Sequence, residues 1–443
     1  MPPRDVVFDA PPVECPDDTA DMTTSGDETV SERTPILGVA GVIAAMAILA
    51  VGNGLMFAYV PVRLGAEGFS PTWAGSILTG LSAGGLAGCL LTAWLVRRVG
   101  HARSYMVFST LILLSHVMVA AAVDPVLWIF ARALYGFAIC AQFIVSQSWL
   151  NDAVTNDIRG RVMSAFYVAY IVFLGVGYYL LALADIRDGS IPLLCILFAS
   201  LSILPVGLTR LRQPPPPAGA AVAIRQAWRI SPVAVAAMLA VGGLSMMIGG
   251  FAPIHATAIG YDQQSVATLM FAMTIGTLVF QIPFGWISDR TDRRYVLFAA
   301  SALVAAGGCL AYGFDGAALP LIIAIYLVWS GSSDSIYSLG SAHASDRASK
   351  EEQVTLSGTL LFVWSIAGFI GTGTGTAMTA LYGTESFMLV SIVIAVAFCL
   401  FVAWRVARTR PVPAEDAGAF VPITAQVPLP VEQPETDRER PMS

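Results

Sequence analysis

Charged side chains are scarce in this 443-residue chain. Lys, Arg, Asp and Glu make up 12% of the residues, whereas 56% are apolar. A soluble domain usually carries ~25% charged residues and is close to half apolar. The mean hydropathy of +0.71 agrees with the shift towards apolar residues. The composition excludes a large soluble domain, gives no indication of nucleic-acid binding, and predicts an integral membrane protein.

Other features needed for common kinds of site are also missing. The six cysteines stand singly, without the close pairing that metal sites and disulfide frameworks use, so we interpret them as packing residues. No zinc motif, nucleophile elbow or phosphate-binding loop occurs, and we therefore expect no enzyme, no metal and no cofactor. The acidic, Pro-rich N-terminus lacks a charged-then-apolar leader, so we expect no cleaved signal peptide.

Long uncharged windows are the main positive feature of the sequence. A bilayer-spanning helix needs about 20 apolar residues. Ten windows without charge approach or exceed this length, and two further apolar stretches carry one charge each, Arg132 and Asp334. The sequence therefore predicts an all-α membrane protein with twelve transmembrane helices. The predicted spans are 34–62, 68–96, 104–123, 125–151, 162–184, 189–209, 230–261, 263–288, 295–314, 316–345, 353–384 and 386–404.

The loops between these spans differ in positive charge. Loops after even-numbered spans hold fourteen Arg and Lys residues, whereas loops after odd-numbered spans hold only Arg63 and Arg187. Because short positive loops stay in the cytoplasm, we expect a multi-pass plasma-membrane protein of the bacterial inner membrane with both termini cytoplasmic. Both tails are poor in aromatic residues and are predicted to be disordered. The predicted parts are an N-terminal tail (1–34), a six-helix bundle (35–208), a cytoplasmic central loop (209–231), a second six-helix bundle (232–407) and a C-terminal tail (408–443).

Similar motifs follow the second and the eighth predicted span. Residues 93–103 are AWLVRRVGHAR, and residues 285–294, at an offset of 192, are GWISDRTDRR. A coincidence of two basic loops is the alternative to a repeat. We favour two homologous, pseudo-symmetric halves related by an axis along the membrane normal, a plan found in transporters.

The second of these motifs resembles the G-x-x-x-D-R-x-[GD]-R-R signature of the major facilitator superfamily (MFS). Other motifs are similar to its YcaD-like branch, and the resemblance covers about residues 36–405. It implies the MFS fold and a secondary active transporter that moves a small molecule by alternating access. The motifs of the branch are Gly52-Asn53-Gly54-Leu55, Pro61-Val62-Arg63, Gly68-Phe69-Ser70, Ser148-Trp149-Leu150-Asn151 before Arg159-Gly160-Arg161, Gln281-x-Pro283-x-Gly285 and Ala342-His343-Ala344-x-Asp346.

Two positions differ from that branch. Gln147 stands where a Glu usually precedes Ser-Trp-Leu, and Tyr178 stands where a Gln usually follows the glycine. Carboxylate chemistry at position 147 therefore does not carry over from the branch. The fifth span also lacks the Gly-Pro-rich motif of proton antiporters in drug-efflux families, which disfavours drug/proton antiport and leaves uptake and efflux open.

The MFS signature is expected to form a gate on the cytoplasmic side. Asp289 can accept hydrogen bonds from the first amides of the fifth span, near Arg161, and such a contact must break when the carrier opens inward. The alternative role is a topology signal that also aids solubility. The residues of this gate motif are Gly285, Asp289, Arg290, Arg293 and Arg294.

The first-half copy of the motif has an arginine where the second has the aspartate. Arg97 cannot cap a helix N-terminus, but Glu351 and Glu352 precede the eleventh span, beside which this loop should lie. We therefore predict a sign-reversed latch from Arg97 and Arg98 to the two glutamates.

The two charges inside spans are candidates for the substrate path, since a charge at a helix centre costs about 2.5 to 3.5 kcal/mol on insertion scales. Asp334 shares a polar helical stripe with Tyr337, and it either binds substrate and couples protons or forms a structural hydrogen-bonded site. Arg132 either binds anionic cargo or fixes helices. The two are predicted to lie roughly 12 to 16 Å apart in depth, too far for a salt bridge.

Weaker candidates are Asn53 and Gln281, which either hydrogen-bond cargo or join transmembrane helices. His116 and His255 are interpreted as packing residues and are left out of the site. We expect a monomer in the lipid bilayer, with a small-molecule substrate, protons as the coupling ion and no nucleic-acid partner. A membrane sensor built on a transporter fold, which binds without transporting, is the main alternative function.

Overall fold

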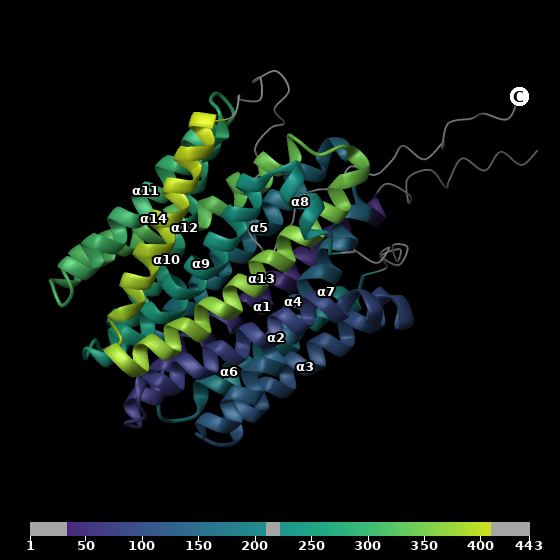
Figure 1. Ribbon diagram of the computed structural model, residues 1–443. Helices are drawn as coiled ribbons and strands as arrows, with labels where there is room; N and C mark the ends of the chain where they lie inside the picture. The colour runs from purple at the N-terminus through teal and green to yellow at the C-terminus, as the bar shows by residue number, and fades with distance from the viewer. Residues whose placement is uncertain (1–32, 210–221, 409–443) are drawn as a thin grey trace, which may run out of the picture.

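In the part of the chain that the structure describes, twelve helical segments are long and apolar enough to cross a membrane, as predicted, with residues 190–207 counted as one segment. The computed structural model describes residues 33–209 and 222–408 (Figure 1). Residues 1–32 and 409–443 of the predicted tails and residues 210–221 of the predicted central loop lie outside the described residues. The first half contains α1 (Arg33–Ala66), α2 (Pro71–Val99), α3 (His101–Ala121), α4 (Pro125–Ala153), α5 (Asn156–Leu180), a 3₁₀ turn η1 (Leu181–Leu183), α6 (Ser190–Leu201) and α7 (Ile203–Gly207). The second half contains α8 (Ile224–Ile230), α9 (Pro232–Ala258), α10 (Gln263–Ser288), α11 (Arg293–Gly313), α12 (Leu319–Ser345), α13 (Lys350–Tyr382) and α14 (Ser386–Arg408).

The helices differ from the predicted spans at several points. The sixth span is divided into α6 and α7 around Ser202, because Pro205 has no amide to donate to the carbonyl of Leu201. A short helix, α8, occupies part of the predicted central loop. At the end where α5 and α13 begin, these helices extend beyond the charge-free windows, because charged residues at a helix end do not interrupt the backbone hydrogen bonds.

Acidic and hydroxyl side chains fix where several helices start. The Asp124 carboxylate accepts from the amide of Leu127 at 2.7 Å ahead of α4. Asp262 accepts from the amide of Ser265 at 2.9 Å ahead of α10, and this bond lowers the pKa of Asp262. Such caps satisfy the amides that have no partner within the helix, so the chain enters each span at a defined residue.

Glycines at related positions let pairs of helices approach closely in both halves. A Cβ on Gly84 of α2 would lie 1.9 Å from the carbonyl oxygen of Ala133 on α4, and a Cβ on Gly276 of α10 would lie 2.1 Å from that of Leu327 on α12. The two glycines are 192 residues apart, the same offset that separates the two basic motifs. The same packing therefore occurs in each half, and the two six-helix bundles are pseudo-symmetric.

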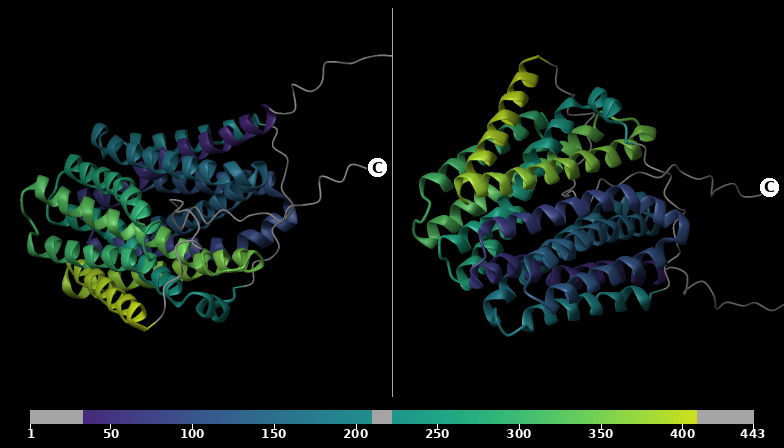
Figure 2. Two further views of the ribbon diagram at one scale, coloured as in Figure 1. Left: turned by 90° about the horizontal axis from the view of Figure 1, so that it is seen from above. Right: turned by 60° about the horizontal axis from the view of Figure 1, so that its bottom comes forward.

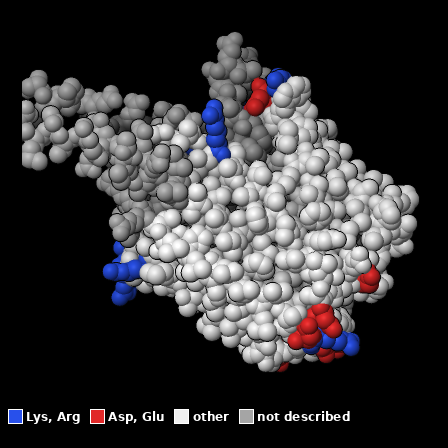
Figure 3. Space-filling model, turned by 180° about the vertical axis from the view of Figure 1, so that it is seen from behind, with Lys and Arg blue, Asp and Glu red and all other residues white. Residues whose placement is uncertain are grey.

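The two bundles lie side by side (Figure 2). They meet where α2 packs on α13, α5 on α10 and α1 on α9. Charged side chains gather towards the two ends of the molecule, with an uncharged band between them (Figure 3). We call the end where α2, α4, α10 and α12 finish the arginine-rich end, and the other the opposite end.

Candidate substrate site

Asp334 is held by hydroxyl groups from two neighbouring helices. On α12, its Oδ1 accepts from Ser245 Oγ of α9 at 3.0 Å, and its Oδ2 accepts from Thr277 Oγ1 of α10 at 2.7 Å. These hydroxyls satisfy the carboxylate without a positive partner: no ion pair to Asp334 occurs within residues 33–209 and 222–408. The sequence did not indicate the two hydroxyl residues as partners, although each is a polar residue within an apolar span.

A cavity of about 220 Å³ lies between the bundles, and Asp334 is the one charged residue that lines it in the described part of the chain. Six aromatic side chains form part of its wall. Asn53 lines it too, donating from Nδ2 to the Tyr170 hydroxyl at 3.3 Å, and its buried Oδ1 has no hydrogen-bond partner among the described residues. The aromatic lining residues are Phe57, Tyr135, Tyr170, Tyr178, Tyr337 and Trp364.

Gln281 connects the two bundles instead of lining the cavity. Its Nε2 donates to the hydroxyl of Tyr167 on α5 at 3.0 Å, and its Oε1 accepts from Ser338 of α12 at 2.9 Å. Gln281 is 2% exposed, so both amide atoms are used inside the protein. Of the roles left open for Gln281, this geometry favours joining helices.

Arg132 is buried in the first bundle, and its guanidinium lies 4.1 Å from the ring centroid of Tyr135. It borders a separate cavity of about 30 Å³, which shares part of its wall with the larger one. Its Nη1 has no hydrogen-bond partner, and no ion pair joins it to Asp334, within the described residues. The Tyr135 ring, which lines the large cavity, therefore lies next to the positive charge.

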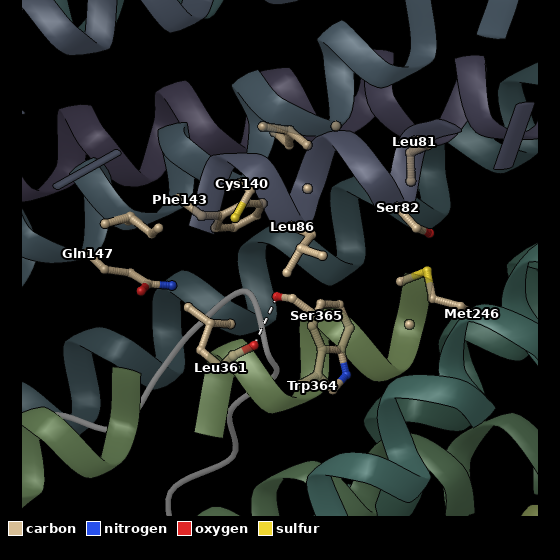
Figure 4. A pocket seen from close by; sticks show the side chains of 15 residues that line it. Leu81, Ser82, Leu86, Cys140, Phe143, Gln147, Met246, Leu361, Trp364 and Ser365 are labelled. Atoms are coloured by element: carbon tan, nitrogen blue, oxygen red, sulfur yellow. Dashed lines mark hydrogen bonds between the residues drawn. The ribbon is translucent and has the colours of Figure 1, made fainter. Parts of the chain in front are cut away.

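A groove of about 90 Å³ extends from the central cavity between α2, α4 and α13 (Figure 4). The two spaces share Leu81, Ile139, Met246 and Trp364. Gln147, six residues before the end of α4, lines the groove, so the groove runs towards the arginine-rich end. The sequence indicated Gln147 only as a departure from the branch and did not predict this groove.

The gate motif forms a tight ionic cluster in the second bundle. Arg293 donates from Nε to Asp346 Oδ2 at 2.6 Å and from Nη1 to Ser288 Oγ at 2.6 Å, and Asp289 lies 3.6 Å from Arg293. The Gly285 carbonyl accepts from the Asp289 amide at 3.0 Å. These contacts join the ends of α10, α11 and α12.

The other two arginines of the motif have different surroundings. Arg294 pairs with Asp292 at 2.5 Å. Burial alone would raise the pKa of Asp292, but the hydrogen bonds and charge of Arg294 hold it below its usual value. Arg290 lies 4.1 Å from the ring centroid of Trp286. The expected hydrogen bonds from the first amides of α5 to Asp289 stay a prediction.

The predicted latch is not formed by the side chains that can be described. Glu352 caps α13 by accepting from the Ser349 amide at 3.1 Å, and it also accepts from Gln226 of α8 at 3.2 Å. Arg98 lies 5.7 Å from the Trp94 ring, and Arg97 is exposed. The side chain of Glu351 lies outside the described residues. The latch therefore stays a prediction, for a state closed at the arginine-rich end.

His255 has specific polar partners, which the sequence did not indicate. Its Nε2 lies 2.9 Å from Asp315 Oδ1 and its Nδ1 lies 2.8 Å from Thr384 Oγ1, at the opposite end of the second bundle. This cluster connects α9 to the loop between α11 and α12 and to the loop between α13 and α14. It does not line the cavity of Asp334.

Residues 41–233 and 233–429 each match the Major Facilitator Superfamily. The chain belongs to the Major Facilitator Superfamily. It is therefore a membrane transporter by family, as the signature at residues 285–294 indicated, and a small-molecule substrate and a lipid environment are implied.

One relative is an uncharacterized MFS-type transporter of Enterobacter sp. (strain 638), 24% identical over 388 residues, covering 87% of this chain and 99% of the relative. The MFS-type transporter YcaD of Escherichia fergusonii is 22% identical over 371 residues, covering 82% of this chain and 93% of YcaD.

Solved structures share the MFS fold at low sequence identity. The nucleoside transporter NupG matches with a TM-score of 0.68 and 10% identity, over 84% of this chain and 100% of NupG. The human organic anion transporter MFSD10 matches with a TM-score of 0.58 and 14% identity, over 83% of this chain and 99% of MFSD10. These similarities establish the fold. The substrate of this chain has to be inferred from its own cavity.

Proposed function

We propose that this protein is a secondary active transporter that moves a small molecule across the bacterial inner membrane by alternating access, coupled to protons at Asp334. The observation that carries the proposal is the position of Asp334. It is the one charged residue lining the cavity between the bundles in the described part of the chain, and two hydroxyl groups hold it. A carboxylate in this place can respond both to protons and to bound cargo.

The contacts between the bundles support alternating access. Towards the opposite end, Thr79 and Thr376 lie 3.0 Å apart across the interface, and Gln263 donates to the carbonyl oxygens of Leu181 and Ala184. The groove, in contrast, runs from the cavity towards the arginine-rich end. Since short arginine-rich loops favour the cytoplasm, we assign the arginine-rich end, and with it both termini, to the cytoplasmic side.

Proton coupling requires that Asp334 change its protonation state during the cycle. Its hydroxyl partners come from α9 and α10, so a movement of either helix changes the hydrogen bonds that favour the carboxylate. Arg132 cannot carry the coupled proton, because a guanidinium group does not release one. We assign it to fixing Tyr135, which its guanidinium contacts, and to setting the potential behind the cavity wall.

The experiment is proton-driven flux in proteoliposomes. A thermal-stability screen of the purified protein identifies a ligand first, because a ligand at ~100 times its Kd stabilises by about 2.7 kcal/mol. An imposed pH gradient should then drive accumulation of that ligand by the wild type. At ligand concentrations that saturate the variant, Asp334→Asn should retain exchange of ligand across the membrane but lose the gradient-driven part, while the exposed control Asp185→Asn keeps both.

Accumulation by Asp334→Asn at the wild-type rate would contradict coupling at this residue. Ligand binding without any flux by the wild type would instead favour a membrane sensor over a transporter.

A further inference from the structure

Two buried polar side chains in the groove each have one polar atom without a partner in the described part of the chain. Gln147 is 3% exposed and Ser82 is 8% exposed. Neither Gln147 Nε2 nor Ser82 Oγ has a hydrogen-bond partner among the described residues, and both residues line the groove. Buried polar atoms in native proteins are nearly always hydrogen-bonded. These two therefore indicate a place where a bound molecule supplies the missing partners.

The rest of the groove is apolar. Figure 4 shows Phe143, Cys140 and Leu86 on one side of the space and Leu361, Trp364 and Ser365 of α13 on the other. Ser365 donates to the Leu361 carbonyl at 2.9 Å, so its hydroxyl is already used. The amide of Gln147 extends into this space at one end. An occupant must accordingly be apolar over most of its length and carry a hydrogen-bond acceptor where it meets Gln147.

The central cavity adds a charge requirement. Asp334 is acidic, and the cavity wall is rich in aromatic rings, whose faces attract cations. Arg132 borders the separate cavity of about 30 Å³. Position 147 is a neutral glutamine, so Asp334 is the one acid among the described residues that line the cavity and the groove. The pair of sites therefore favours a molecule with a single positive charge.

The dimensions connect the two sites. Asp334 lies eleven residues before the end of α12 and Gln147 six before the end of α4, a difference in depth of about 8 Å at 1.5 Å per residue. The cavity and the groove, about 220 and 90 Å³, together reach the lower end of small-molecule sites, ~300 Å³.

We infer that the substrate of the transport proposed above is an elongated organic amine. Its ammonium group binds Asp334, its apolar body lies along the groove against Trp364 and Phe143, and a hydrogen-bond acceptor near its other end receives the Nε2–H of Gln147. Ser82 offers a second hydrogen bond to the same molecule. That this molecule is transported rests on the proposed function, whereas its binding does not and is measured separately.

The charge requirement is tested with three probes that share a phenyl ring on an alkyl chain and differ in the charge of the group at the end of that chain. Equilibrium binding of 4-phenylbutylamine, 4-phenylbutanol and 4-phenylbutyrate to the purified full-length protein is measured by calorimetry at pH 7. We expect a Kd for the amine at least tenfold lower than for the other two. Asp334→Asn should abolish this advantage and leave the Kd of the alcohol within twofold. Equal or tighter binding of the alcohol or the acid by the wild type overturns the inference, whether or not the variant folds.

The acceptor requirement is tested with two amines that differ at the far end, 4-(4-methoxyphenyl)butylamine and 4-(4-methylphenyl)butylamine. A neutral hydrogen bond predicts that Gln147→Leu weakens the methoxy probe about 3- to 10-fold and leaves the methyl probe unchanged. The matched control is Gln142→Leu on the same helix, because Gln142 hydrogen-bonds Ser109 of α3 and does not line the groove. Equal effects of Gln147→Leu on both probes overturn the assignment of Gln147.

Transport and substrate class fail in different ways. If the amines bind in the predicted order but do not move across proteoliposome membranes, the site stands and the transport function is wrong. If the protein transports a ligand from the stability screen but prefers no amine, the transport function stands and the substrate class is wrong.

Discussion

The hydrogen bond between Gln281 and Tyr167 should help to hold the two bundles together. Both side chains are buried, and the bond joins α10 to α5 across the interface at 3.0 Å. Hydrogen bonds between transmembrane helices average about 0.6 kcal/mol and reach about 1.7 kcal/mol. Its loss should therefore shift the equilibrium between joined and separated bundles by about 3-fold, and by up to about 20-fold at the upper value.

Two variants separate the bond from other effects of substitution. Tyr167→Phe leaves the Gln281 Nε2–H buried without its acceptor, which costs about 1–3 kcal/mol in the joined state. The double variant Tyr167→Phe/Gln281→Leu removes both groups and avoids this penalty. We therefore expect the single variant to shift the equilibrium at least as far as the double one.

The assay measures distances between spin labels on the two bundles by pulsed electron paramagnetic resonance. Labels at Arg103 of α3 and Tyr295 of α11 suit it, because both side chains are exposed and both helices begin at the arginine-rich end. The native cysteines are replaced in this background. Unchanged distance distributions in both variants would refute the idea that this bond holds the bundles together.

Three further outcomes follow from other contacts. Asp346→Asn should destabilise the protein by about 3 kcal/mol, measured as a lower melting temperature, because buried Arg293 loses its nearest negative charge; an unchanged melting temperature would contradict this. Gly276→Leu should cost about 1–3 kcal/mol or more by forcing α10 from α12, whereas Gly249→Ala, with open space at its Cβ, should be tolerated. The pKa of Asp292 is below its usual value, so its contribution to stability is present above pH ~4 and is lost as the pH falls further; Asp292→Asn should melt at a lower temperature than the wild type at pH 7 and approach it near pH 3.

Much of the fold could be predicted because membrane insertion leaves a simple mark on the sequence. Each span must be apolar for about 20 residues, and the loops must carry the charges. Caps such as Asp124 and Asp262 also act within a few residues of sequence. The break at Ser202 was not predicted, since proline is tolerated in many transmembrane helices and only the surrounding packing decides whether the helix divides there.

The candidate site was less predictable, because contacts between helices depend on their rotation and on pairings far apart in the chain. The stripe on α12 placed Asp334 on a polar face. The partners of Asp334, Ser245 and Thr277, lie 89 and 57 residues away, and nothing local marks them. Gln281 illustrates the same limit: its polarity suggested a role inside the membrane, but only its contact with Tyr167 distinguishes a link between bundles from a ligand site.

The latch can now be predicted more sharply. Glu352 already accepts two hydrogen bonds, one of which caps α13, so moving its carboxylate to reach Arg97 would weaken the cap in return for a contact that water and salt screen. Arg97 should therefore pair with Glu351 rather than with Glu352. An exposed ion pair contributes about 0.2–1 kcal/mol, which shifts a two-state population by about fivefold at most.

With the labels at Arg103 and Tyr295, Arg97→Glu should lower the population closed at the arginine-rich end, and Glu351→Arg in the same chain should restore it. Glu352→Arg should fail to restore closure, since it removes the cap of α13. If Glu352→Arg restored closure and Glu351→Arg did not, Arg97 would pair with Glu352. The argument that the cap of α13 keeps Glu352 from this ion pair would then be wrong.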